Sequence, residues 1–393
     1  MSTMNHRLLQ IQNYKVGGLG IEILWKLVKY EDISAESVRR GDPGGHVMYQ
    51  LMTDGWVAGL LDEGTKILDQ YTKFSGKTLL EEATLNSLQL FHSVLVRQVA
   101  LQDAIRDAGV PMLTSRLDLL LQSVNPKTME ANYVTKIAWY LQYNSWLPKH
   151  CLAACKVLQT LASQPLIQPK LVQYLGKTEV LRRNLMSGFV DCLVREDMDL
   201  PAGTDDNEEL SEDATTGRIK GAAALCILEI IYKSLILAPT GPNLGYFLLG
   251  FDCHRPESTE LQNPGVKGQI TTCFHRIVQI LFSTAGKQVG TLSYGGLVEP
   301  ALRILLQLAT VHDTREPTLR YLRTSYDFTG TLLENLVLHS AKSDRLIEWY
   351  QNFYMGQLLK LSAIEVHALI FSRQRSQALR MAKILVTGGF TRL

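Results

Sequence analysis

The sequence lacks the features that mark several large classes of protein. Its 393 residues include only six cysteines, at scattered positions, whereas disulfide-stapled extracellular domains are short and cysteine-dense. Neither sign of charge is in excess, because 40 Lys and Arg residues face 38 Asp and Glu residues for a net charge of +2. We therefore expect a reducing compartment, no direct contact with nucleic acid and no long-range attraction to a membrane.

No apolar stretch is long enough and free enough of charge to span a membrane. The longest, AAALCILEIIYKSLILA at residues 222–238, contains Glu229 and Lys233. A span needs about 18 residues with few or no charges, so we expect a buried helix instead. The first twenty residues also lack a basic segment followed by an apolar core, so no secretory signal is predicted.

Linear motifs for catalysis are missing as well. The sequence holds no G-x-S-x-G, no H-E-x-x-H and no kinase H-R-D and D-F-G pair. Gly245 and Gly250 are spaced like the front half of a phosphate-binding loop, but Phe251 and Asp252 stand where that loop needs Lys and Ser or Thr. A triad assembled from distant residues would leave no linear trace, and nothing indicates one. We predict no catalytic residue, no cofactor, no small-molecule substrate and no enzyme activity.

The same stretch, GPNLGYFLLGFD at residues 241–252, fits a short buried helix. Pro242 suits the first turn of a helix, and Gly250 can take the left-handed conformation that ends one, with Phe251 folded back as its apolar contact. We expect alanine to be tolerated at Gly245, in the interior of this helix. The apolar stripe has helical spacing: Leu244, Phe247, Leu248 and Phe251.

Two groups of Cys and His residues are candidate metal ligands. They are His150 with Cys151 and Cys155, and Cys253-His254 with Cys273 and His275. Structural zinc sites usually combine two Cys-x2–4-Cys-type pairs. The first group has no clear partner pair, and in the second group the ligands come adjacent or one apart. Buried cysteine acting as a small apolar side chain is the favoured interpretation, so no metal-binding residue is predicted.

Helical periodicity, by contrast, is present nearly everywhere. In residues 271–285 the apolar positions 274, 277, 278 and 281 form one helix face, and strictly alternating strand patterns are nearly absent. Helix pairs recur every 35–45 residues or so, without a shared consensus. The sequence predicts an all-α fold of about fifteen helices, an irregular HEAT/ARM-like α-solenoid of stacked antiparallel pairs. Capping-box patterns at residues 78–81, 331–334 and 362–365 are candidate helix starts.

Along the chain we expect a helical N-terminal portion at residues 1–115 and a continuous solenoid at 116–393. Residues 196–217 are expected to form an acidic loop, and residues 252–268 and the stretch RRGDPGGH at 39–46 are expected to be loops as well. Two basic groups, Arg320 with Arg323 and Arg373 with Arg375 and Arg380, could contact an acidic partner segment. Exposed solenoid faces are the favoured interpretation of both.

Several segments in consistent order carry a family resemblance. They are LLLQSVNPKTMEANYVTKIAWYL (119–141), residues 150–176, NLMSGFVDCL (184–193), GPNLGYFLLGFDCHRPESTELQNPGVKG (241–268), PTLRYLRTSYDF (317–328), SAIE (362–365) and SRQRS (372–376). From about residue 115 to 385 the chain resembles an internal portion of the giant inner-ring scaffold nucleoporins of the nuclear pore. The earlier residues, GDPGGHVMYQ among them, are less distinctive.

The resemblance implies a structural constituent of the nuclear pore complex at the nuclear envelope. Such a scaffold binds other nucleoporins, both inner-ring scaffold and linker nucleoporins, through short linear segments. It supports pore assembly and nucleocytoplasmic transport of protein and mRNA, and needs no cofactor. No binding residue is carried over. The alternative is a soluble HEAT-type adaptor or transport receptor, which would show more regular repeats and an acidic surface.

Overall fold

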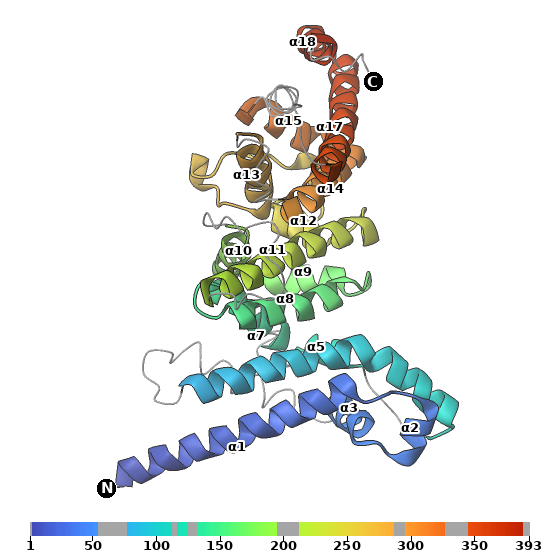
Figure 1. Ribbon diagram of the computed structural model, residues 1–393. Coiled ribbons are helices and arrows are strands. Elements are labelled where there is room, and N and C mark those ends of the chain that lie inside the picture. The colour runs from blue at the N-terminus through green and yellow to red at the C-terminus, as the bar shows by residue number, and fades with distance from the viewer. Residues whose placement is uncertain are drawn as a thin grey trace. The chain divides into compact units, whose positions relative to one another are not determined.

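The computed structural model of the chain consists of helices and the loops that join them. It describes residues 2–53, 77–111, 116–124, 132–194, 212–286, 295–326 and 345–387. These ranges contain sixteen α-helices, three short 3-10 helices and no strand (Figure 1). The predicted all-α fold class is confirmed, and the helices are close in number to the fifteen or so expected from periodicity.

Amphipathic periodicity explains why these helices form where they do. In α13 (Cys273–Gly286) the four residues at helical spacing, Phe274, Ile277, Val278 and Leu281, are all buried. The long apolar run forms α11 (Glu212–Leu237), and the charges that interrupt it, Glu229 and Lys233, form an ion pair one turn apart on its surface. Both helices thus bury their apolar positions, and the Glu229–Lys233 pair stays at the surface.

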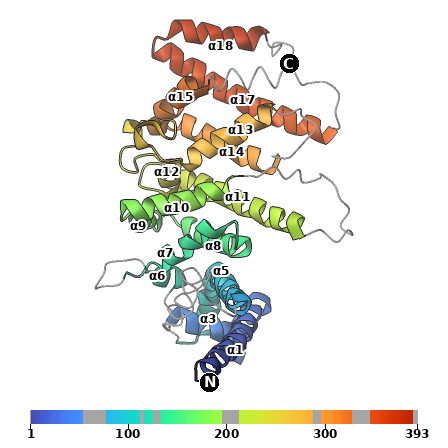
Figure 2. The same ribbon diagram turned by 90° about the vertical axis from the view of Figure 1, so that its left-hand side faces the viewer.

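Residues 1–188 form a first compact unit. Its long helix α5 packs against α1 on one side, as both views show (Figures 1 and 2), and also against α8. Buried residues at helical spacing on α5, Leu88, Phe91 and Leu95, supply the apolar contact. The helices of this unit are α1 (Ser2–Tyr30), α2 (Ala35–Arg40), α3 (Pro43–Thr53), α5 (Lys77–Ala108), α6 (Leu117–Leu121), α7 (Asn132–Trp139), η1 (Tyr140–Tyr143), α8 (Pro148–Ala162) and α9 (Gln168–Leu175).

Residues 189–393 form a second compact unit, and α10 (Glu179–Cys192) spans the division between the two. In this unit the helices pack on near neighbours along the chain: α11 on α12 and α14, α12 on α13, α13 on α14, α14 on both α15 and α17, and α17 on α18. This is the near-neighbour packing of an irregular α-solenoid. Besides α11 and α13, its elements are α12 (Leu244–Leu249), η2 (Pro256–Ser258), η3 (Val266–Gly268), α14 (Gly295–Thr310), α15 (His312–Tyr326), α17 (Arg345–Phe371) and α18 (Arg375–Thr387).

The capping-box patterns differ in outcome. The 78–81 pattern lies at the beginning of α5, which is described from Lys77 onward, whereas the 362–365 pattern lies deep inside α17 and starts no helix. There the Ser362 hydroxyl donates to the carbonyl of Leu358 instead of capping a helix. The 331–334 pattern lies outside the described residues. A capping box does exist at Ser34 and Ser37, where two serines bond reciprocally at the start of α2.

The loop expected at residues 39–46 is wrong for most of its length. Arg39 and Arg40 end α2, Gly41 caps it with a left-handed φ of 75°, and α3 begins at Pro43. Of the acidic segment at 196–217, residues 212–217 belong to α11 and the rest lie outside the described residues. Within the described chain, none of the helices combines the length and apolar character needed to cross a membrane.

Candidate functional site

The segment 241–252 forms a capped helix, α12, and holds no phosphate cradle. Asn243 is the N-cap residue, and its side chain accepts a hydrogen bond from the Tyr246 N–H at 2.8 Å. Gly250 ends the helix with φ 84°, and the Phe251 N–H donates to the Tyr246 carbonyl at 2.9 Å. The predicted stop at Gly250 is confirmed. The predicted start at Pro242 is wrong, because Pro242 precedes the cap.

Both glycines of α12 are needed for close packing. A Cβ on Gly245 would lie 3.0 Å from the carbonyl oxygen of Ile231 in α11 and 3.0 Å from Leu235 Cγ. The structure therefore argues against the expectation that alanine is tolerated at Gly245, since helix propensity does not account for a neighbouring backbone. At Gly250 a Cβ would lie 2.7 Å from Thr272 Cγ2, in addition to the strain of a positive φ.

His275, at the start of α13, holds the loop between α12 and α13 in place. Its Nδ1 accepts from the Thr272 N–H at 3.0 Å, so the ring proton lies on Nε2, which donates to the carbonyl of Gln262 at 2.9 Å. Burial lowers the pKa of His275, although the bond to Gln262 opposes the shift. Both ring nitrogens are engaged, so His275 is not positioned to bind a metal ion or to act as a general base.

An aromatic cluster surrounds this histidine. The ring of Phe274 meets Phe251 and Tyr321 edge-on, with centroids 6.3 and 5.2 Å apart, and Tyr321 also meets His275 at 5.5 Å. We use "aromatic cluster" for Tyr246, Phe251, Phe274, His275 and Tyr321. It joins α12, α13 and α15, and such edge-to-face contacts add specificity to burial.

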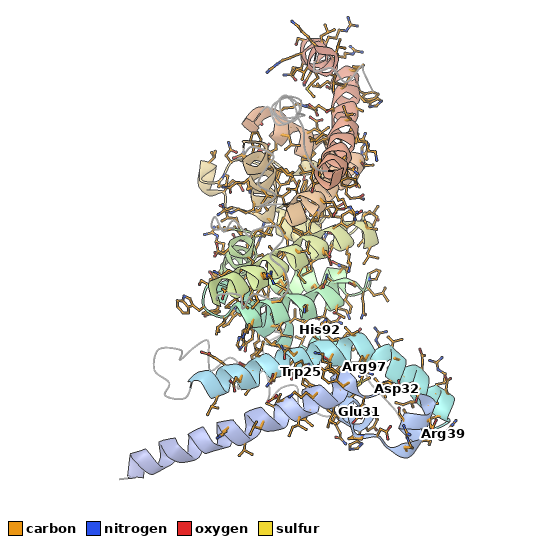
Figure 3. All side chains as sticks on the ribbon, in the orientation of Figure 1. Trp25, Glu31, Asp32, Arg39, His92 and Arg97 are labelled. Carbon is orange, nitrogen blue, oxygen red and sulfur yellow. The ribbon has the colours of Figure 1, made fainter. Side chains whose placement is uncertain are left out.

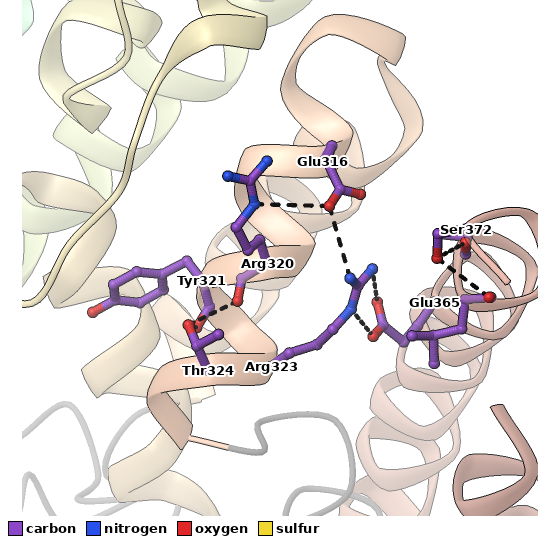
Figure 4. Close-up of polar contacts among 9 residues, drawn as sticks. Glu316, Arg320, Tyr321, Arg323, Thr324, Glu365 and Ser372 are labelled. Carbon is purple, nitrogen blue, oxygen red and sulfur yellow. Dashed lines mark hydrogen bonds and ion pairs between the residues drawn. The ribbon is translucent and has the colours of Figure 1, made fainter. Parts of the chain in front are cut away.

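Two polar contacts tie the family-like segments to one another around this cluster. The Tyr321 hydroxyl donates to Asn263 Oδ1 in the loop at 3.0 Å. Arg323, two residues further along α15, donates from Nε to Glu365 Oε1 in α17 at 2.5 Å and also lies 3.9 Å from Glu316 (Figure 4). The stretches 241–268, 317–328 and 362–365 therefore meet in the fold, although they are far apart in the sequence.

The Arg323–Glu365 pair is largely shielded from water. Burial raises the pKa of the Glu365 carboxyl, while the Arg323 guanidinium that donates to it opposes the shift. Arg320 also lies beside Glu316, with Nε and Oε1 3.8 Å apart. Arg323 is thus paired within the protein, whereas Arg320 is 57% exposed and its contact with Glu316 lies at the surface.

The second candidate metal group, Cys253-His254 with Cys273 and His275, does not form a metal-binding cluster. Cys273 is fully buried, which raises the pKa of its thiol. Cys253 is half-buried, and its thiol lies 3.9 Å from the carbonyl of Phe251, while His254 is exposed. In the described part of the chain no group of three or more potential metal-ligating side chains comes together.

The first candidate metal group lies in the first unit, where α8 packs on α5. His150 Nε2 is 2.8 Å from the carbonyl of Glu81 and 3.1 Å from the Thr84 hydroxyl, and its ring stacks on Tyr140 at 5.9 Å. Burial lowers the pKa of His150 to about 4, so the ring is neutral at pH 7. Cys151 and Cys155 are buried as small apolar side chains.

In the first unit two arginine side chains cap the C-terminal ends of other helices, a role that was not predicted from the sequence. Arg97 of α5 donates to the carbonyls of Val28 and Glu31 at the end of α1 (Figure 3). Arg39 of α2 donates to the last carbonyls of α5, those of Asp107 and Ala108, at 3.0 and 3.3 Å. Cations here satisfy orphan carbonyls and favour the helix dipole. No local sequence pattern predicts these two caps, because each arginine lies more than sixty residues from the carbonyls that it caps.

The contacts described above join helices and loops to one another. Comparison with known proteins identifies the family. Residues 40–392 match the family described as "Nuclear pore complex scaffold, nucleoporins 186/192/205".

Two relatives are similar over nearly the whole chain. The human nuclear pore complex protein Nup205 is 31% identical over 396 residues, which cover 95% of this chain and 19% of the relative. The Drosophila melanogaster protein of the same name is 28% identical over 431 residues, which cover 96% of this chain and 20% of the relative. The chain thus spans about a fifth of the length of these relatives.

Proposed function

The chain belongs to the nuclear pore complex scaffold family of nucleoporins 186/192/205, and on this basis we propose that it is a structural, non-enzymatic part of the pore's inner ring at the nuclear envelope. The observation that carries the proposal is the extent of the family match, which runs from residue 40 to 392. The fold supports it, since the family-like segments are the ones that interlock around the aromatic cluster.

As a scaffold the chain would bind other nucleoporins through short linear segments and so support pore assembly and nucleocytoplasmic transport. A solenoid suits this role, because stacked helix pairs expose long surfaces while each pair is stabilised only by its neighbours. The near-zero net charge favours recognition by shape and apolar contact over attraction to nucleic acid. Family membership favours this scaffold over an adaptor or transport receptor.

Imaging a fluorescently tagged copy of the full chain tests the proposal. We expect a punctate nuclear rim, together with recovery of inner-ring proteins when the tagged chain is pulled down. Diffuse shuttling between nucleus and cytoplasm, with no inner-ring protein recovered, would favour a transport receptor instead.

A pair of matched variants shows whether the signal depends on the fold. Leu248→Asp places a charge at a fully buried position of α12 and should abolish both the rim and the pull-down. Leu166→Asp makes the same change at an exposed position and should leave both unchanged. Equal behaviour of the two variants would show that the rim signal does not report the folded protein.

A further inference from the structure

The turn between α17 and α18 exposes large apolar side chains. Ile370 and Phe371, at the end of α17, are 62% and 86% exposed, and Leu379 on α18 is 70% exposed. One face of Phe371 stacks on His367, with ring centroids 6.4 Å apart, and this fixes the ring without covering it. They lie at the end of α17 and within the first two turns of α18, two helices that follow each other across a short turn (Figure 2), which we call the α17–α18 corner.

The charged side chains of the same corner are all basic. Residues 366–387 contain no Asp or Glu and four basic residues, in a chain whose net charge is only +2. The four are Arg373, Arg375, Arg380 and Lys383. In contrast to Arg320 and Arg323, the exposed Arg373 and Arg375 pair with no acidic side chain among the described residues.

Arg373 adopts a backbone conformation that normally belongs to glycine. Its φ is 60°, and among the described residues it is the one non-glycine with a positive φ. It occupies the left-handed position of a helix C-cap, where the Gln374 N–H donates to the Leu369 carbonyl at 2.9 Å and the Arg373 N–H donates to Ile370. The equivalent caps at Gly41 and Gly250 use glycine. An arginine held at such a position points to a role for its guanidinium.

We propose that this α17–α18 corner, formed by Ile370, Phe371, Arg373, Arg375 and Leu379, binds a short acidic segment of another protein that carries a large apolar side chain. The apolar side chain packs on Phe371 and its neighbours, and the flanking carboxylates meet the two arginines. The proposal rests on the proposed scaffold function, for which it names the chemistry of one partner.

A membrane surface would be less well matched by this corner. An interfacial helix lays a continuous apolar face into the lipid boundary. On α18, however, Ala378 and Met381 are buried within the protein, and exposed Leu379 and Val386 stand two turns apart. The corner offers a small apolar spot beside charges, which suits a peptide.

Two substitutions test the corner without threatening the fold. Arg373→Gly places the residue preferred at a left-handed cap, and Arg375→Glu places an acid in the first turn of α18, where the helix dipole favours it. The double variant should be at least as stable as the parent chain. Lys170→Glu is the matched control, because Lys170 is an exposed cation in the first turn of α9.

The probe is a synthetic fluorescent peptide in which Phe and Leu alternate with Asp and Glu, and its binding to the full chain is measured by anisotropy at low and high salt. We expect the double variant to weaken binding about tenfold or more, Phe371→Ser to weaken it about fivefold, and Lys170→Glu to have no effect. High salt should weaken binding to the parent chain and have little effect on the double variant.

Three outcomes would overturn the proposal. One is equal binding by the parent chain and the double variant. A second is that the double variant loses binding to vesicles that contain phosphatidylserine but keeps its binding to the peptide, which would assign the corner to a membrane. A third is no peptide binding together with loss of self-association in the double variant, measured by analytical ultracentrifugation, which would assign it to a second copy of the chain. Because the probe is bound in vitro, a negative result here leaves the nuclear-rim test unaffected.

Discussion

Two neutral histidines, His150 buried and His275 half-buried, show how differently the two units of this molecule use polar contacts. In the first unit His150 of α8 reaches across to α5 and donates to the carbonyl of Glu81. In the second unit His275 of α13 reaches the loop carbonyl of Gln262. Each ring lies against a tyrosine, Tyr140 in one case and Tyr321 in the other.

The two contacts differ in whether the accepting carbonyl has another hydrogen-bond donor besides the histidine. The Glu81 carbonyl lies within α5, where the helix supplies a backbone donor, so His150 reinforces a contact that apolar residues already make. The Gln262 carbonyl lies in the loop from Phe251 to Thr272, outside any helix, so His275 supplies a partner that secondary structure does not. The His150 contact therefore reinforces a helix pair, whereas this loop depends on the His275 contact and on Gly250.

The largest effect is expected where the loop leaves α12. Gly250→Val combines a positive φ with a clash against Thr272 and should lower the free energy of unfolding of this region by about 4 kcal/mol. Hydrogen exchange at the amides of α12 and α13 measures it. Gly265→Val is the matched control, since Gly265 has a φ of 88° but open space around its Cβ, and should cost about half as much. Equal costs would show that the Thr272 contact is unimportant.

Acid should weaken the His150 contact by a measurable amount. Because the folded pKa of His150 is lowered to about 4, the unfolded chain binds its proton first as pH falls. Stability is therefore fully present above pH 6.5 or so and is lost towards pH 4, by about 3 kcal/mol in total. Hydrogen exchange of α5 and α8 amides across this range checks it.

A variant without the imidazole at position 150 isolates the contribution of His150 to the pH dependence of stability. His150→Phe keeps a ring beside Tyr140 and should flatten the pH dependence of α5 and α8. The loop should still loosen in acid, because the lowered pKa of His275 acts with the same sign. An unchanged slope in the variant would mean that His150 is not the titrating group.

Gly245→Ala tests whether the α11–α12 pair tolerates an added side chain as poorly as the loop does at Gly250. We expect a loss of about 2 kcal/mol, because the new Cβ meets the Ile231 carbonyl oxygen and Leu235 of α11. Gly221→Ala, within α11, has open space and should be neutral or stabilising. Denaturant unfolding of both variants measures the contrast. A neutral Gly245→Ala would show that the two helices move apart easily.

The smallest effect is expected for the Tyr321 hydroxyl. Tyr321→Phe removes its hydrogen bond to Asn263 and should cost about 1 kcal/mol, while the ring contacts with Phe274 and His275 remain. A double-mutant cycle with Asn263→Ala checks the pairing by hydrogen exchange in the loop. Additive costs in the cycle would mean that the two side chains do not stabilise each other.

Local pattern was sufficient for the helices and for the stop at Gly250, because both depend on residues within a turn or two. It was insufficient wherever a distant backbone decides the outcome. Gly245 looks like an ordinary helix-interior glycine until α11 is packed against it, and the 362–365 pattern resembles a cap until Glu365 pairs with Arg323. The start of α12 at Asn243 could have been read from the sequence, since Asn before an apolar run is a favourable N-cap.

By itself, the sequence determined the all-α class, the buried stripes and, through ordered family-like segments, the nucleoporin resemblance, because periodicity and capping act between near neighbours. Only the tertiary structure decided which of those segments meet. The aromatic cluster and the Arg323–Glu365 pair follow from contacts between residues far apart in the chain. No local rule encodes such contacts, since each depends on how the intervening helices pack.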